Sequence, residues 1–206
     1  MVLGGQPPGR VGRRRIIFEG PEFRLRAFLF RDTIAPVELR DGDLLLRPPA
    51  ESDVPAVTAA CQDEELARFI PYFPSPYREA DAQDWISAVN KGGLARTFLM
   101  VDATSGDVLG AIEVRLGEVG SIGYWVAKEA RGRGIATSAT MLLSRWAVTE
   151  GDVERLELTT HPENAASQRV AEKAGFTREG VLRCHAKFRE GRRDSVIFSL
   201  LPGDLD

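Results

Sequence analysis

The chain has 206 residues, of which 43% are apolar, 28% charged and 8% aromatic, and its net charge is −3. This length supports one or two domains, and the composition excludes a wholly disordered chain and a collagen-like repeat. No run of 18 apolar residues is present, which excludes a bilayer-spanning segment, and the balance of 27 basic and 30 acidic residues gives no drive toward nucleic acid or an anionic membrane.

Residues 1–36 form an N-terminal extension that we expect to be distinct from a main domain at 37–206. Residues 1–15 are rich in Gly and Pro and carry four Arg and no acidic residue. This composition favours a solvated basic tail over the alternative, an arm that binds nucleic acid. Apolar alternation over residues 16–31 predicts two strands about a turn, and Pro36 marks the boundary.

The first half of the main domain mixes strands and helices. A short strand is predicted over 43–47, followed by a helix for which Ser52 is the expected N-cap. Prolines exclude a helix through 71–76, and a second helical face, carrying Trp85 and Ile86, ends at Gly92 and Gly93. Two strands over 97–102 and 108–115 are joined by a hairpin turn.

The second half contains one strand–helix–strand unit. A strand carrying Ile122, Tyr124 and Val126 leads to a helix whose apolar positions, starting at Ile135, step by four, three and four. A strand over 153–160, a helix over 164–174 ended by Gly175, and strands over 176–182 and 194–201 complete an α+β order.

The segment between the strand ending at Val126 and the helix beginning at Ile135 has the features of an anion site. Gly132 and Gly134 lack a Cβ atom, so backbone N–H groups there can turn toward a ligand. The following helix N-terminus adds unpaired N–H groups and the positive end of its dipole. A pyrophosphate fits such a loop, which matches neither the Walker A pattern nor the complete dinucleotide fingerprint.

A second polar group follows the strand over 153–160. Asn164 is the expected N-cap of the next helix, and Ser167 lies one turn further on, so both can project polar groups at the same helix end.

Together these segments resemble the GNAT acetyltransferase superfamily. The resemblance rests on Arg131-Gly132-Arg133-Gly134-Ile135-Ala136, which is similar to the family's pyrophosphate signature Arg/Gln-x-x-Gly-x-Gly/Ala. Further motifs are similar to the Rim-type subgroup, which acetylates ribosomal-protein N-termini: Gly123-Tyr124-Trp125, Asn164-x-x-Ser167, Glu172-Lys173-x-Gly175-Phe176, Glu179-Gly180-x-Leu182-Arg183 and Gly191-Arg192-x-Asp194. The resemblance covers about residues 40–202.

The resemblance implies a twisted, mostly antiparallel sheet whose central strands splay, flanked by helices. Acetyl-CoA would lie between the two splayed strands as acetyl donor, with its pantetheine along the backbone of Trp125, Val126 and Ala127. Its pyrophosphate would sit on residues 131–137, which are Arg131, Gly132, Arg133, Gly134, Ile135, Ala136 and Thr137. Asn164 and Ser167 would flank the pantetheine arm and the sulfur.

The implied reaction is direct acetyl transfer to a primary amine. The backbone N–H near Val126 is the implied oxyanion donor. Many family members carry a tyrosine acid seven residues after the helix-starting Asn, where this chain has Ala171, so Ser167 is our substitute, with a purely structural Ser167 left open. Glu113 is the first candidate base, and Glu157 the second.

The acceptor is less determined. Deprotonating an α-amine at pH 7 costs about 1 kcal/mol and a lysine amine about 4.6 kcal/mol, so a site without an evident strong base favours a protein N-terminal α-amine. The alternatives are a small-molecule amine acetyltransferase and a non-catalytic acyl-CoA-binding module. The resemblance places the wall of the acceptor site at Phe69-Ile70-Pro71-Tyr72-Phe73-Pro74, with a plain loop between helices as the alternative. For Tyr124, core packing is favoured over acceptor lining.

The remaining expectations concern the cellular compartment, metal binding and the N-terminal extension. Two cysteines are too few for a disulfide scaffold, and with no export signal we expect a cytoplasmic protein. We expect no metal, because Cys184 and His185 are adjacent on a strand and point to opposite faces. For the extension at 1–36 we consider two roles, a homodimer interface and a cover over the acceptor site.

Overall fold

The computed structural model describes residues 37–92, 95–151 and 153–205. The predicted basic tail and the two strands expected over 16–31 lie outside the described residues and stay predictions. All that follows concerns the described part of the chain.

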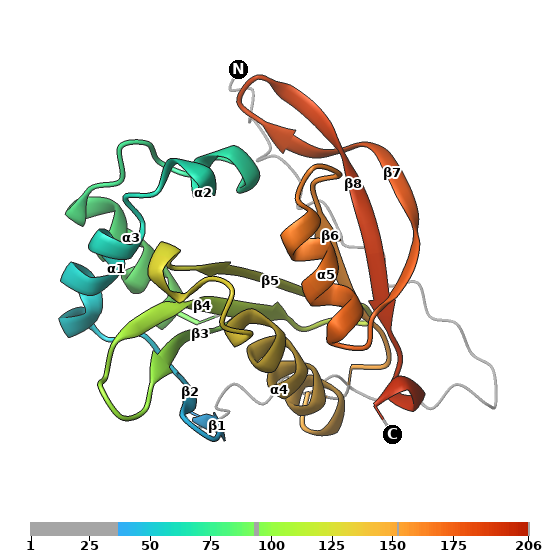
Figure 1. Ribbon diagram of the computed structural model, residues 1–206, viewed down its shortest axis with the longest axis horizontal. Coiled ribbons are helices and arrows are strands. Elements are labelled where there is room, and N and C mark those ends of the chain that lie inside the picture. Colours follow the sequence, from blue (N-terminus) through green and yellow to red (C-terminus); the bar gives the residue numbers. More distant parts are fainter. Residues whose placement is uncertain (1–36, 93–94, 152, 206) are drawn as a thin grey trace, which may run out of the picture. The chain divides into compact units, whose positions relative to one another are not determined.

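A single mixed sheet organises the domain (Figure 1). Its spatial order is β1-β2-β3-β4-β5-β6-β8-β7, and each neighbouring pair is antiparallel except β5–β6, which is parallel. The strands are β1 (Leu39–Asp41), β2 (Leu44–Arg47), β3 (Ala95–Asp102), β4 (Val108–Arg115), β5 (Gly120–Val126), β6 (Leu156–Thr160), β7 (Thr177–Phe188) and β8 (Gly191–Leu200). The expected α+β class, with a mostly antiparallel sheet flanked by helices, is confirmed.

Five α-helices accompany the sheet in the described residues. They are α1 (Val54–Ala60), α2 (Glu64–Phe69), α3 (Glu79–Asn90), α4 (Ile135–Thr149) and α5 (Ala165–Lys173), with short 3-10 turns at η1 (Glu51–Asp53), η2 (Lys128–Ala130) and η3 (Pro202–Asp204). The parallel β5–α4–β6 unit is the strand–helix–strand unit predicted from the sequence.

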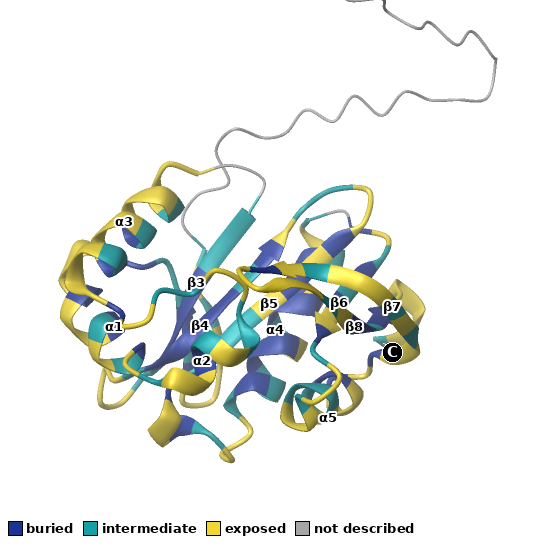
Figure 2. Ribbon diagram, turned by 90° about the horizontal axis from the view of Figure 1, so that it is seen from above, coloured by how far each residue is buried: buried dark blue, intermediate teal, exposed yellow. Residues whose placement is uncertain are grey.

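Strand alternation divides the core between two faces of the sheet. Leu99 and Val101 of β3 pack in one buried cluster with α1 and α3, while Phe98, which precedes Leu99 and points to the other face, meets Trp146 of α4 with ring centroids 6.1 Å apart. Figure 2 shows the buried residues concentrated on the central strands and on the side of α4 that faces them. The helices therefore cover both faces, and the central strands are buried between them.

The two central parallel strands separate partway along their length. β5 and β6 pair only from Gly120 with Leu156 to Ile122 with Leu158. Beyond that point β5 stays paired with β4 as far as Val126, and β6 stays paired with β8 as far as Thr160. The facing edges of β5 and β6 are thus open at their C-terminal ends, which confirms the predicted splay.

Three local expectations are corrected. Ser52 is not a helix N-cap: the first turn is a 3-10 turn, and Asp53 accepts from the Ala50 N–H at 2.7 Å while pairing with Arg47. The strand expected over 153–160 begins at Leu156, because the chain first turns back from α4. Strands β7 and β8 form a longer hairpin than expected, with a bulge in β7 between Leu182 and Ala186.

Candidate active site

The segment between β5 and α4 forms an open, glycine-lined loop. Gly132 has φ +74° and Gly134, the N-cap of α4, has φ +81° with ψ −2°. A Cβ atom built on either glycine would meet no atom within 4 Å, so the space above both is free. Helical hydrogen bonding from this end begins with the Ser138 N–H, which donates to the Gly134 oxygen at 3.1 Å. The amides before Ser138 in the first turn therefore remain available to an anion.

A cavity of about 340 Å³ opens at this loop. We call it the loop cavity. Its walls come from β5, the loop, the first turn of α4, one side of α5 and part of α2. Of the residues predicted to hold the cofactor, those that line it are Trp125, Val126, Arg131, Gly132, Gly134, Ile135, Ala136, Thr137, Asn164 and Ser167.

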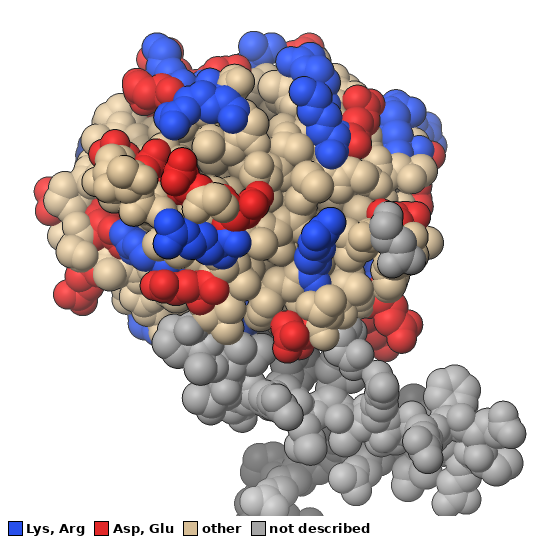
Figure 3. Space-filling view, turned by 60° about the horizontal axis from the view of Figure 1, so that its bottom comes forward, with Lys and Arg blue, Asp and Glu red and all other residues tan. Residues whose placement is uncertain are grey.

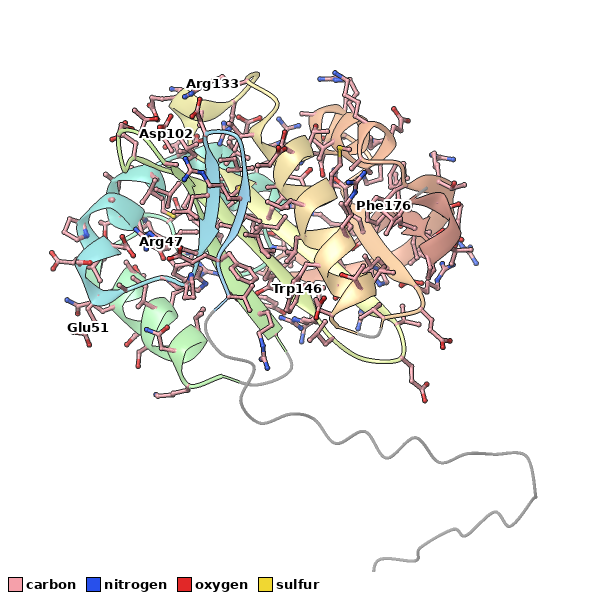
Figure 4. All side chains as sticks on the ribbon, turned by 90° about the horizontal axis from the view of Figure 1, so that it is seen from below. Arg47, Glu51, Asp102, Arg133, Trp146 and Phe176 are labelled. Carbon is pink, nitrogen blue, oxygen red and sulfur yellow. The ribbon has the colours of Figure 1, made fainter. Side chains whose placement is uncertain are left out.

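Two predicted cofactor residues do not line this cavity. The Ala127 N–H donates to the Leu109 oxygen at 2.8 Å, which occupies that amide in the sheet. Because backbone groups alternate sides along a strand, the Val126 N–H then faces the open edge of β5. Arg133 points away toward the β3–β4 turn, where its guanidinium lies 4.0 Å from Asp102 (Figure 4).

The Arg131 side chain, which lines the loop cavity, is also bound by neighbouring elements. Its guanidinium pairs with the carboxylates of Asp63 and Glu65, the latter at 2.6 Å, and both its Nε and Nη2 donate to the Val126 oxygen at 3.2 Å. Burial works against the charge on Asp63, but the Glu65 amide and Arg131 outweigh it and lower the pKa of Asp63. The side chain therefore ties α2 to the end of β5.

Helix α5 begins as predicted. The Asn164 side-chain oxygen accepts from the Ser167 N–H at 3.0 Å, which caps the helix. The Ser167 hydroxyl in turn lies 2.9 Å from the Tyr124 hydroxyl, which reaches it from the open end of β5. Burial raises the pKa of Tyr124 to about 12, against the opposing effect of the Ser167 hydrogen bond.

A second cavity, of about 540 Å³, lies against the α1 and α3 side of the sheet. We call it the aromatic cavity. Its walls include the whole segment Phe69–Pro74, together with aromatic side chains from other elements: Tyr77, Trp85, Trp125 and Phe188. Burial raises the pKa of the Cys61 thiol in its wall to about 12, so this thiol stays protonated at neutral pH.

The charge of the aromatic cavity is one-sided. Among the described residues that line it are four carboxylates, Asp81, Asp84, Glu113 and Asp194, and no Lys or Arg. On the face of the molecule that Figure 3 shows, by contrast, basic and acidic side chains lie interspersed. The aromatic cavity is therefore suited to a positively charged guest.

The two predicted bases differ in placement. Glu113 lies on β4 opposite Gly123, whose missing side chain leaves room above it. Its carboxylate accepts from Thr97 Oγ1 at 3.4 Å and lies 3.5 Å from the exposed Arg115 Nε. Glu113 lines the aromatic cavity. Glu157 lines neither cavity, and Arg155 holds its carboxylate at 3.0 Å.

The two cavities meet where the sheet splays. Tyr124, Trp125, Asn164 and Ser167 line both, as do Phe69 and Ile70 at the end of α2. The expected packing role of Tyr124 is therefore incomplete, because its hydroxyl lies at the junction. Sequence spacing gave no signal for this contact, since Tyr124 and Ser167 are 43 positions apart.

The searches for metal sites and membrane spans cover only the described residues. Among them no group of three or more His, Cys, Asp or Glu side chains is arranged to hold a metal ion. Within the same ranges, no helix has the length and apolar character needed to cross a bilayer.

Comparison with known proteins identifies a family and similar sequences. Residues 43–177 match the family model described as "Acetyltransferase (GNAT) domain". The chain is 31% identical over 129 residues to the "Putative ribosomal N-acetyltransferase YdaF" of Bacillus subtilis, covering 61% of this chain and 69% of that protein. It is 37% identical over 83 residues to "Probable N-acetyltransferase YjcK" of the same organism, and that match spans 46% of YjcK and 40% of this chain.

A solved structure supports the fold. Mycobacterium smegmatis RimJ, determined in complex with CoA-disulfide, superposes with a TM-score of 0.72 at 22% identity, covering 82% of this chain and 88% of RimJ. At this identity the likeness concerns the fold.

Proposed function

The chain belongs to the GNAT family of acetyltransferases, in its Rim-like subgroup, and from this premise we propose that it transfers an acetyl group from acetyl-CoA to a primary amine. One observation carries the proposal: two cavities of different chemistry, one beside an anion-binding loop and one acidic and aromatic, meet at Tyr124, Trp125, Asn164 and Ser167. A donor and an acceptor that enter from the two sides would meet at these four residues.

The loop cavity suits the donor. The amides before Ser138 and the open space above Gly132 and Gly134 fit a pyrophosphate. Further along the same cavity, β5 has an unpaired edge beyond Ile122, along which an amide-bearing arm can lie, and the Val126 N–H at the end of this edge is left for the acetyl oxygen. When bound, acetyl-CoA supplies the acetyl group and a thiolate leaving group.

The chain's own residues take three roles in this proposal. The Val126 N–H stabilises negative charge that develops on the acetyl oxygen, an interaction worth about 2.7–4 kcal/mol when one such donor is removed from an enzyme. Glu113 removes a proton from the acceptor amine, directly or through water. Ser167 donates a hydrogen bond toward the departing sulfur.

The first candidate acceptor is a protein N-terminal α-amine. Its pKa is about 7.7–8.0, so little free energy is needed to deprotonate it at pH 7. Among the described residues that line the aromatic cavity, Glu113 is the carboxylate on the strand next to β5. A single carboxylate is a weak base, and it is sufficient for an amine that is already partly neutral at pH 7. The similarity to the "Putative ribosomal N-acetyltransferase YdaF" supports this class of acceptor.

A second candidate is a small cationic amine. It is favoured by the lining of the aromatic cavity, where carboxylates and aromatic rings occur with no Lys or Arg among the described residues. Asp84 on α3 has no ion-pair or hydrogen-bond partner among the described residues, so its charge is free to act on a guest.

A panel of acceptors separates the two candidates. Purified protein and acetyl-CoA are combined with free N-terminal peptides, Nα-blocked lysine peptides, and small amines of one or two charges, and kcat/KM is measured by thiol release. An N-terminal acetyltransferase acts on the first group alone, whereas a small-amine enzyme prefers dications. Asp84→Asn would then raise KM for a dication several-fold, and Glu79→Gln, on the same helix but outside both cavities, is the matched control.

A further inference from the structure

The hydroxyls of Tyr124 and Ser167, at the junction of the two cavities, have two protons between them. Tyr124 Oη and Ser167 Oγ lie 2.9 Å apart, and neither hydroxyl has another hydrogen-bond partner among the described residues. Each hydroxyl carries one proton. The hydrogen bond between them uses one of the two, so the pair has one remaining proton to offer the cavities.

The direction of the hydrogen bond follows from the acidity of the two groups. A phenol is a stronger donor than an aliphatic alcohol, and the alcohol oxygen is the better acceptor. Tyr124 is therefore expected to donate to Ser167, which turns the Ser167 proton outward. The serine backbone is held at the same time, because its N–H is bound to the Asn164 cap.

The location of the pair determines which groups the Ser167 hydroxyl proton can reach. Ser167 and Tyr124 line both cavities, and the strand edge beside them is open because β5 and β6 no longer pair beyond Ile122 and Leu158. The pair therefore lies at the junction of the loop cavity and the aromatic cavity. The position in α5 where the family's usual tyrosine would stand is the buried Ala171, so no other phenol from that helix competes.

We propose that Tyr124 is a positioning residue: by donating to Ser167 it holds the Ser167 hydroxyl proton toward the sulfur of the bound thioester, and Ser167 stabilises the thiolate as it leaves. This inference rests on the proposed acetyl transfer.

The chemistry balances without transfer of either hydroxyl proton. The C–N bond forms, the C–S bond breaks, and the C–S electron pair goes to sulfur. Nitrogen releases one proton to Glu113 or water, and the thiolate takes one from water. A thiol of ordinary pKa, about 8.5, is far more acidic than the Tyr124 phenol at about 12. Taking a proton from the pair would therefore be uphill, and the pair acts through hydrogen bonding alone.

The first test reads the sulfur directly and needs no turnover. CoA is bound to wild type, Tyr124→Phe and Ser167→Ala, and the thiol pKa of the bound CoA is followed by the ultraviolet absorbance of the thiolate. Loss of one hydrogen bond to a charged group should raise that pKa by about one pH unit in Ser167→Ala, and by a comparable amount in Tyr124→Phe. An unchanged thiol pKa in Tyr124→Phe would overturn the inference.

The second test is a double-mutant cycle on acetyl transfer. Each single variant should lower kcat about tenfold with the KM for acetyl-CoA changed less than threefold, and the double variant should be no slower than the slower single one. Losses that multiply would show independent roles and contradict the inference. Ser144→Ala, a buried serine on α4 outside both cavities, controls for loss of a hydroxyl from the fold and should leave kcat unchanged.

The two tests separate the inference from the proposed function. If wild type binds CoA but transfers no acetyl group, the proposed function fails. The bound-thiol titration still decides whether Tyr124 sets the direction of the Ser167 proton. If wild type is active, and the thiol pKa of bound CoA and kcat are both unchanged in the variants, the proposed function stands and the inference is refuted.

Discussion

Replacing Gly134 by Glu tests the anion-binding loop. Gly134 has φ +81°, a left-handed conformation that an L-residue adopts at a cost of about 1–2 kcal/mol. A Cβ atom there would meet no protein atom within 4 Å, so no steric clash adds to that strain. The new side chain extends into the open space at the N-terminus of α4, where the pyrophosphate is proposed to lie.

The effect on binding can be worked from this geometry. Two unit charges about 4 Å apart repel by about 4 kcal/mol at an effective dielectric constant of 20. Since about 1.4 kcal/mol corresponds to a factor of ten, full repulsion would raise Kd by about 10³. The flexible side chain can turn partly away, so we expect the Kd for CoA to rise by about 100-fold or more.

The assay is titration calorimetry of CoA into folded protein, with thermal unfolding measured in parallel. Gly92→Glu is the matched control, because Gly92 has φ +75°, has nothing within 4 Å of an added Cβ, and lines neither cavity. The control should lose similar stability and keep wild-type affinity. If Gly134→Glu bound CoA as wild type does, the assignment of the loop would be refuted.

Substitutions at three further positions probe the site. Arg131→Gln should lower the free energy of unfolding at pH 7 by about 1–3 kcal/mol, because its guanidinium bonds two carboxylates and a backbone oxygen. Asp63 has a lowered pKa in the folded state, so the loss of unfolding free energy in the variant should be present above pH about 4 and shrink as pH falls through that pKa. Urea melts of wild type and variant measure it, and a loss that does not depend on pH would contradict the ion pair. Asn164→Ala should cost about 1 kcal/mol by removing the cap and also raise the KM for acetyl-CoA, whereas Asn164→Asp should keep the cap; equal stability of the two in thermal melts would contradict the capping role. Glu113→Gln should lower kcat/KM by about 10² and flatten the acidic limb of its pH profile, and a limb of wild-type shape would remove Glu113 as base.

The local features of the site were predictable because they depend on short sequence separations. The positive φ angles at Gly132 and Gly134, the start of α4 at Ile135 and the cap at Asn164 all follow from residue type and neighbours within one turn. The parallel unit followed from a strand–helix–strand order, since parallel strands need a crossover connection.

Contacts across long separations were not predictable from pattern. Arg131 sits in the predicted phosphate motif, yet its side chain is taken up by Asp63 and Glu65, more than 60 residues away. Helix α2 has six residues and too few turns to show a helical period, so its existence and its place beside the loop were missed. The Ser52 cap failed because an ion pair between Arg47 and Asp53 holds that turn instead.

The measurement that tests the account most directly is the stoichiometry of acetyl transfer by the purified wild-type protein. Thiol released from acetyl-CoA and acetylated amine formed are counted together, with and without acceptor, for a peptide bearing a free α-amine and for a small dicationic amine. Acetyl transfer predicts that one of these acceptors accelerates thiol release and that thiol and acetylated product appear in equal amounts. Acetyl-CoA that binds tightly but releases no thiol with either acceptor would contradict the account and indicate an acyl-CoA-binding module.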